Sequence, residues 1–510
     1  MTFQDLVTVA PFVAAIVVAA GVITADIVVP NRHGPVLVVG LGGLAIVGLL
    51  TIVTGSTSAT AFGGAYRVDD LTTFLDIVFV GITALTLVFA PDYLESRRLP
   101  LAEFAAVLIF AMTGAMLISA SADLLVLFIG LELMVLPGYL LAGYHKNDGY
   151  STEGAIKYFL LGSFSSAIFL FGLAFVWGLT GTTRVSEVAA QLTSMVATGG
   201  LSAGLALGLA FLTTGVAFKI AAVPFHYWTP DAYQGSPTPV TGYLSVGPKV
   251  GAFALILRLF VEALGPLKAD WLPVVVVLAI LTMTLGNLVA LTQTNVKRML
   301  AYSSIAHTGY MLVGLAAYAA GRIEGLEGLL YYGAAYSVMN LGAFAVIAAL
   351  QKRAGVTSNL ETFAGLIRRE PILGGLMTIF LLSLTGIPPL AGFFAVGRPR
   401  GHDNPHRPPG HHPGAAPGDR GERRPRYRVT RGARGSLEGR IHAPDGPAAA
   451  TRGGQAVGGF DEPRTRIPGL EPAPDSVRDG LGLRVEDSRL GEQRRLARVS
   501  EIEHLGQHRR

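Results

Sequence analysis

The feature that most constrains this chain is a succession of long apolar segments separated by short connections. A helix needs about 20 mostly apolar residues to cross the hydrocarbon core of a bilayer. Composition agrees, because 51% of the 510 residues are hydrophobic and 15% are charged, against about 25% in an average soluble domain. The sequence therefore predicts an all-α polytopic membrane protein with about twelve transmembrane helices in the lipid bilayer. The expected spans are 8–29, 35–54, 70–90, 101–119, 123–143, 155–179, 203–223, 238–262, 271–291, 299–320, 326–350 and 371–396.

The lysine and arginine residues of the connections predict the orientation of the chain. Cytoplasmic loops of membrane proteins carry an excess of these residues. Connections that follow odd-numbered spans hold ten of them, whereas connections that follow even-numbered spans hold four. We therefore expect the odd-numbered connections to be cytoplasmic and the N-terminus to lie outside.

Composition changes abruptly after Val396. The last 114 residues hold 22 arginines, no lysine and 7 of the 11 histidines. They cannot bury enough apolar surface to fold alone, so we expect a transmembrane domain over 1–396 and a basic, unstructured tail over 397–510. Such a composition is typical of GC-rich codons read in the wrong frame, and a frameshift product is the interpretation we favour. A linker and a nucleic-acid-binding arm are the alternatives.

Three ionisable residues lie deep within expected spans, where a charge costs about 2.5–3.5 kcal/mol on insertion scales. Glu132 lies nine residues past Asp123, which is about 13 Å along a helix. Lys219 ends a long uncharged run just before Pro224 breaks the helix. Lys249 lies among small apolar residues, about 15 Å into its helix. We expect all three to carry the function. The structural alternatives are an interhelical hydrogen bond for Glu132 and an interfacial, snorkelling side chain for Lys219.

Three further residues are weaker candidates. Lys157 opens the sixth expected span, where anchoring at the membrane interface explains it equally well. His226 lies in the Pro224 break and could relay protons or bind backbone carbonyls. His307 lies within the tenth span, where a hydrogen bond between helices is the competing explanation.

A weak internal repeat divides the expected transmembrane domain. Glu153-Gly154, Tyr158 and Ser163 recur as Glu327-Gly328, Tyr332 and Ser337, a shift of 174 residues. Each copy precedes a span broken by prolines, "AVPFHYWTPDAYQGSPTPV" near 224 and "TGIPPLAGFF" near 388. Paired broken helices in two halves are typical of transporters with inverted repeats.

Some classes of protein are excluded by what the sequence lacks. There is no cysteine, which rules out disulfides, cysteine zinc sites and cysteine-ligated iron–sulfur clusters in this chain. There is also no nucleotide-binding glycine loop and no metalloprotease or hydrolase motif. The chemistry expected of the chain is the movement of small ions, most simply protons.

At these residues the sequence resembles a known family. "FKIAAVPFHYWTPDAYQGSPTPVTGYLSVGPKVGAF" (218–253), "GNLVALTQTNVKRMLAYSSIAHTGYMLVG" (286–314) and "LSLTGIPPLAGFF" (382–394) are similar to stretches of the antiporter-like membrane subunits of respiratory NADH:quinone oxidoreductase. The resemblance covers roughly residues 1–396 and is closest to the N-type subunits. The sister L and M subunits carry a His-containing stretch at the position of Lys249.

The resemblance implies a role for each candidate. Glu132 would pair with Lys219 and set its proton affinity, and Lys249 would be the central proton carrier. His226 and His307 would lie beside the same buried, hydrated axis. Redox chemistry elsewhere in the complex would drive the proton from Lys219 towards Lys249.

The resemblance also implies where the cofactors and partners lie. The chain itself would bind no cofactor, because NAD, FMN, iron–sulfur clusters and quinone would be held by partner subunits. Its partners would be the other membrane subunits and the lipid bilayer, with no nucleic acid. Its location would be the bacterial cell (inner) membrane.

The sequence departs from the family at one position. Family members carry a lysine directly after "AGFFA", whereas this chain has Val396 there. Family members have two further spans, fourteen in all. The last proton carrier and the end of the second repeat are therefore expected to be absent from the chain as written.

Two other functions remain open. A subunit of a multisubunit cation/proton antiporter would share the fold and the buried lysines, and proton movement that depends on Na⁺ would indicate it. A non-pumping assembly scaffold would tolerate loss of Lys219 and Lys249 while its deletion abolished assembly.

Overall fold

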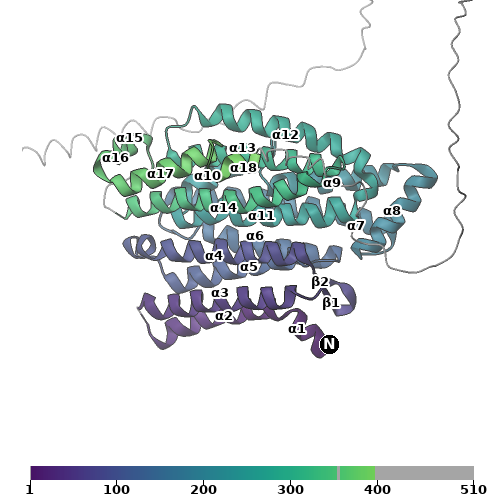
Figure 1. Cartoon of the computed structure of the whole chain (residues 1–510), viewed down its shortest axis with the longest axis horizontal. Helices are drawn as coiled ribbons and strands as arrows, with labels where there is room; N and C mark the ends of the chain where they lie inside the picture. The colour runs from purple at the N-terminus through teal and green to yellow at the C-terminus, as the bar shows by residue number, and fades with distance from the viewer. Residues whose placement is uncertain (1, 31, 353–356, 397–510) are drawn as a thin grey trace, which may run out of the picture. The chain divides into compact units, whose positions relative to one another are not determined.

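The computed structural model describes residues 2–30, 32–352 and 357–396, and the tail predicted for 397–510 lies outside them (Figure 1). The first half contains α1 (Phe3–Thr8), α2 (Ala10–Val28), α3 (His33–Gly55), β1 (Ala59–Ala61), β2 (Tyr66–Val68), α4 (Asp70–Ser96), α5 (Leu101–Ser119), α6 (Leu124–Ala142), α7 (Gly149–Thr180) and α8 (Val185–Gly199). The second half contains α9 (Ala203–Lys219), α10 (Trp228–Gly235), α11 (Thr238–Ile256) with a π-helical continuation (Leu257–Ala263), α12 (Lys268–Ala290), α13 (Val296–Ala319), α14 (Ile323–Gln351), α15 (Leu360–Phe363), α16 (Leu366–Arg369), α17 (Pro371–Leu384) and α18 (Ala391–Val396).

Each of the twelve expected spans has a helical counterpart, which confirms the all-α membrane architecture. Among the described residues, nine helices are long and apolar enough to cross a membrane: α2 to α7, α11, α12 and α14. The other three counterparts are α9, α13 and α17. α9 and α17 have 17 and 14 residues, because each ends where prolines break the expected span.

Polar side chains fix where several of these helices begin. Asp69 accepts a hydrogen bond from a backbone amide in the first turn of α4, and Asp123 and Asp148 do the same for α6 and α7. Ser202 caps α9 and Asn295 caps α13. Such caps satisfy amides that have no partner inside the helix, so short polar residues between apolar runs mark the helix starts.

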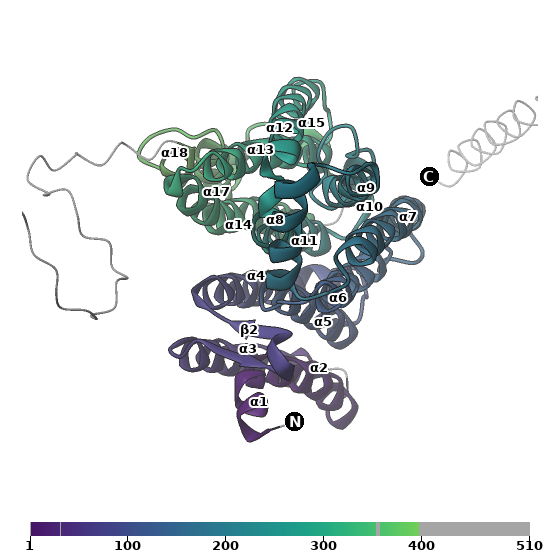
Figure 2. The same ribbon diagram turned by 90° about the vertical axis from the view of Figure 1, so that its right-hand side faces the viewer.

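The core is centred on α11. Every residue of α11 is buried, and the helix packs against α4, α5, α6, α13 and α14. In the end-on view α11 lies among these helices, whereas α2 and α3 lie together at the edge (Figure 2). Lys249 is a residue of α11, so the fold places this amine away from lipid.

The two broken helices occupy equivalent places in the two halves. α9 packs against the long helix α7, and α17 packs against the long helix α14. Both breaks contain a cis proline, at Val223–Pro224 and at Pro388–Pro389. This arrangement agrees with the repeat seen in the sequence, because α7 and α14 carry its two copies.

Side chains from neighbouring helices satisfy the backbone groups that the first break exposes. The indole of Trp228 donates to the carbonyl of Phe218 at 3.1 Å. Thr308 donates to the carbonyl of Ile220 at 2.9 Å. Unpaired backbone groups are costly at membrane depth, so these contacts explain how the break is accommodated beside Lys219.

The connections contain structure that the sequence analysis did not predict. β1 and β2 form an antiparallel hairpin between α3 and α4. α8 fills the connection between α7 and α9, and its buried residues Val185, Val188 and Leu192 lie on one face. An amphipathic helix of this kind has no 20-residue apolar run, so the search for membrane spans in the sequence did not find it.

Candidate functional site

Lys219 is held at the end of α9 by groups from two other helices. Its side chain is buried, and Nζ donates to Ser166 Oγ at 2.8 Å, to Tyr139 OH at 3.3 Å and to the carbonyl of Gly162 at 3.4 Å. These partners are all uncharged. The amine therefore lies in a polar pocket just before the helix breaks, with no ion-pair partner among the described residues.

Glu132 lies near Lys219 without touching it. No ion pair joins the two residues in the described part of the chain, whereas the charge of Glu132 acts on both Lys219 and Tyr139. Its Oε1 atom is buried without a hydrogen-bond partner in the described residues. Tyr139 follows Glu132 by seven residues on α6 and binds Lys219 directly, so one helix carries both the carboxyl group and a partner of the amine.

Lys249 is bound by α13. Its side chain is 3% exposed, and Nζ donates to the carbonyl oxygen of Ser304 at 2.5 Å and to its hydroxyl at 2.6 Å. The amine also lies 5.8 Å from the centre of the Tyr336 ring, within the range of a cation–π contact. Like Lys219, it has uncharged partners and no carboxylate at ion-pair distance among the described residues.

His307 belongs to the same group of side chains as Lys249. It follows Ser304 by three residues on α13, one turn further along. Its Nδ1 atom contacts the hydroxyl of Tyr332, and its ring centre lies 4.9 Å from that of Tyr336. The charge of Lys249 acts on His307. The structure thus places an amine, hydroxyls and an imidazole together in the core.

His226 lies in the break between α9 and α10. Its side chain is 4% exposed and stacks on Tyr227, with ring centres 4.6 Å apart. Its Nδ1 atom is buried without a hydrogen-bond partner in the described residues. An unpaired ring nitrogen beside a broken helix is a ready partner for a water molecule.

Lys157 lies in different surroundings. It forms ion pairs with Glu153 at 2.7 Å and with Asp231 at 2.8 Å, and Asp231 also binds Arg298 at 2.6 Å. Its side chain is 43% exposed. The structure therefore places Lys157 in a surface ion-pair network, apart from the contacts of Lys219 and Lys249.

The sequence analysis missed the partners of both lysines. Tyr139, Ser166, Ser304 and Tyr336 each come from a helix other than that of the lysine they contact. The spacing of Ser304 and His307, three residues apart on one helix, places both on one face and could have linked them. Packing decides which helices face each other. The sequence around each lysine therefore could not predict its other partners.

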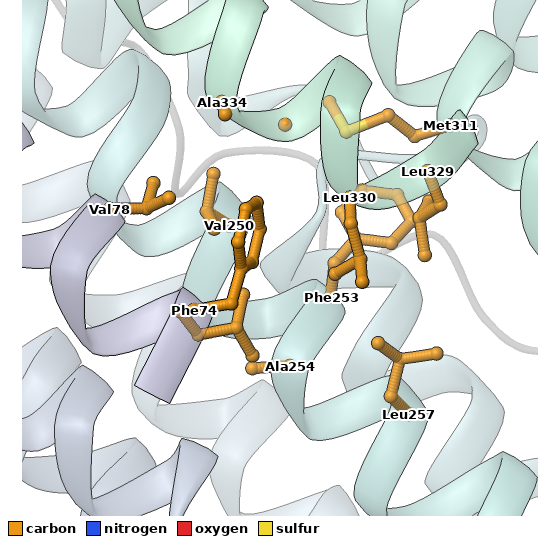
Figure 3. A pocket seen from close by; sticks show the side chains of 12 residues that line it. Phe74, Val78, Val250, Phe253, Ala254, Leu257, Met311, Leu329, Leu330 and Ala334 are labelled. Atoms are coloured by element: carbon orange, nitrogen blue, oxygen red, sulfur yellow. The ribbon is translucent and has the colours of Figure 1, made fainter. Parts of the chain in front are cut away.

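A small apolar cavity lies between α4, α11, α13 and α14. Side chains of α4, α11, α13 and α14 line it, among them Phe74, Val250, Phe253 and Met311 (Figure 3). Its volume of about 20 Å³ would hold roughly one water molecule, and apolar cavities of this kind stay dry. Among the described residues there is also no group of three or more His, Asp or Glu side chains that could hold a metal ion.

The fold and these buried ionisable groups define a class of protein: a polytopic membrane protein with amines and imidazoles in its interior. A family model for the transmembrane region of NADH:quinone oxidoreductase/Mrp antiporters matches residues 121–396. The chain belongs to this family of membrane subunits. This finding confirms the family resemblance seen in the sequence.

Individual relatives agree. NADH-quinone oxidoreductase subunit N of Moorella thermoacetica is 43% identical over 396 residues, which make up 77% of this chain and 80% of that protein. A chain of respiratory complex I from Thermus thermophilus with bound aureothin is 31% identical with a TM-score of 0.60, over 76% of this chain and 81% of that one. A chain of the Mrp complex from Dietzia sp. DQ12-45-1b shares the fold at 23% identity and a TM-score of 0.63, over 78% of this chain and 73% of that one.

Proposed function

We propose that this chain is a proton-translocating membrane subunit of the N type in a NADH:quinone oxidoreductase. The name of the relative from Moorella thermoacetica and the likeness to a chain of complex I support this assignment. The observation that carries it is the pair of amines, Lys219 and Lys249. Each is buried and bound by uncharged groups in the described structure.

The contacts support a defined role for each residue. The carboxylate of Glu132 favours a proton on Lys219 when it is charged, because opposite charges attract. When that attraction weakens, an N–H bond of the Lys219 ammonium breaks and the proton passes, through water at the break, towards Lys249. Ser304 and His307 lie next to Lys249 and would take the proton onward. His226, with its unpaired Nδ1 in the break, would bind the water involved.

The setting of the subunit follows from the same proposal. Its partners are other membrane subunits and lipid, and the location is a bacterial cell membrane with the N-terminus outside. NAD, FMN, iron–sulfur clusters and quinone lie in those partner subunits. The energy for proton movement then reaches this chain as a change of charge at Glu132.

The test is the ratio of protons moved to NADH oxidised in vesicles that contain the assembled complex. We expect Lys219→Ala and Lys249→Ala to lower this ratio, because each removes a group that holds the proton. Lys268→Ala is the matched control, since Lys268 is an exposed lysine at the start of α12.

Two results would contradict the proposal. An unchanged ratio in both lysine variants, with the complex assembled, would favour a scaffold. Proton movement that required Na⁺ would favour the cation/proton antiporter. This chain also shares its fold with a chain of the Mrp complex.

A further inference from the structure

A second acidic group lies inside a membrane-spanning helix and has no role in the proposed function so far. Asp76 is seven residues past Asp69, which is about 10 Å along α4. Its side chain is 2% exposed, and Ser119 donates its hydroxyl to Oδ1 at 2.5 Å. The hairpin residue Tyr66 is also buried. Among the described residues, Ser119 is the group that donates a hydrogen bond to this carboxyl group.

Polar groups continue from Asp76 towards the start of α4. Thr72 lies one turn before Asp76 on the same face, and Asp69 lies one turn before Thr72. The hydroxyl of Thr72 donates to Asp69 Oδ1 at 2.9 Å and to the carbonyl of Ser119 at 3.1 Å. Arg258 donates to the same carbonyl at 2.8 Å and to Asp69 Oδ1 at 2.7 Å.

This row of groups ends at a hollow in the surface. Arg258 donates to Glu262 Oε1 at 2.6 Å, and Arg67 donates to Glu262 Oε2 at 2.6 Å. Exposure of the side chains rises from 1% for Arg258 to 32% for Arg67. Arg67, Glu262 and Arg184 line a hollow of about 540 Å³ between the hairpin and α8, on the side that the loop charges predict to be outside.

Among the described residues, no lysine or arginine forms an ion pair with Asp76. Arg67 and Arg258 bind Asp69 and Glu262, so two positive charges are matched by two negative ones. An ionised Asp76 would add an unmatched charge to a buried cluster, which costs free energy. The cluster therefore has a place for one more proton.

We propose that Asp76 is a proton-release group on the outer side of this subunit. The inference rests on the proposed function, because it assigns the step after the proton leaves the lysines. The O–H bond of the Asp76 carboxyl breaks, and the proton passes through water alongside Thr72 to water in the hollow, leaving Asp76 as a carboxylate until it is protonated again. Burial raises the pKa of Asp69, but the hydrogen bond and charge of Arg258 outweigh burial and hold that pKa at about 2. Asp69 therefore stays ionised and paired with Arg258 while the proton passes.

The discriminating variant is Asp76→Asn in the assembled complex. An asparagine oxygen can still accept the hydrogen bond from Ser119, but the amide cannot carry the proton. We expect the ratio of protons moved to NADH oxidised to fall by as much as it falls in Lys249→Ala. Asp76→Glu should restore it, and Ser119→Ala should retain pumping with an altered pH profile. Asp70→Asn, on the exposed first residue of α4, is the matched control.

The outcomes separate this inference from the proposed function. If Lys249→Ala lowers the ratio and Asp76→Asn does not, Asp76 is a structural hydrogen-bond partner and the inference is overturned alone. If neither variant lowers the ratio in an assembled complex, both fail. If Asp76→Asn prevents assembly while Asp76→Glu restores assembly without restoring the ratio, the release role is also excluded.

Discussion

At the scale of single residues, the molecule treats its buried charges in two ways. Arg258 is buried and bound by two carboxylates, Asp69 and Glu262, so its charge is matched. Lys219 and Lys249 are equally buried but are bound by hydroxyls and carbonyls. A buried ion pair broken on one side costs several kcal/mol, whereas an amine with neutral partners can gain or lose its proton. The ion pairs of Arg258 stabilise the structure, whereas the neutral partners of the two lysines suit proton transfer.

The Asp69–Arg258 ion pair predicts a pH dependence. Burial raises the pKa of Asp69, but the hydrogen bond and charge of Arg258 lower it by more. The pKa therefore falls from its usual 3.8 to about 2. A lowered pKa contributes stability that is present above about pH 4 and lost as the pH falls towards 2. Asp69→Asn should therefore lower the thermal stability of the solubilised complex at pH 7, and this difference should narrow below pH 4.

The measurement is the thermal unfolding of both proteins between pH 7 and pH 3. Asp70→Asn, on an exposed residue, is the control. Equal stability of wild type and Asp69→Asn at pH 7 would contradict the role given to the pair.

At the scale of helices, the sequence predicted positions well and contacts poorly. The twelve spans and both breaks were visible as apolar runs and prolines. α8 and the β1–β2 hairpin were missed, because an amphipathic helix and two three-residue strands give no long apolar run. Tyr139 and Ser304 were missed as partners of the lysines, because neither lies on the helix of the lysine that it binds.

The close packing of α5 against α6 gives a test at this scale. A Cβ atom on Gly114 would lie 2.2 Å from the backbone nitrogen of Met134. Gly114→Ala should therefore push α5 away from the helix that carries Glu132, at a cost of about 1–3 kcal/mol for overpacking. Lower thermal stability of the assembled complex is the expected result.

Gly178→Ala is the matched control for this test. It lies on α7, and a Cβ there meets no atom within 4 Å. If both variants were as stable as the wild type, the helices would not be in the contact that the structure shows.

At the scale of the whole molecule, one bundle of helices contains three groups of buried ionisable side chains. Lys219 and Glu132 lie at the first break, Lys249 and His307 lie in the core, and Asp76 leads to the hollow at Arg67. The family match ends at residue 396, the same residue at which composition changes. The proposed path uses side chains that all precede that residue.

The measurement that tests the central claim most directly is proton pumping by the complex with Lys249→Arg. Arginine keeps the positive charge and the hydrogen-bond donors, but its guanidinium does not lose a proton in proteins. If Lys249 works by releasing its proton, the ratio of protons moved to NADH oxidised falls as in Lys249→Ala. If Lys249→Arg pumps as well as the wild type, a fixed charge is enough at this position, and the claim that Lys249 carries the proton is wrong.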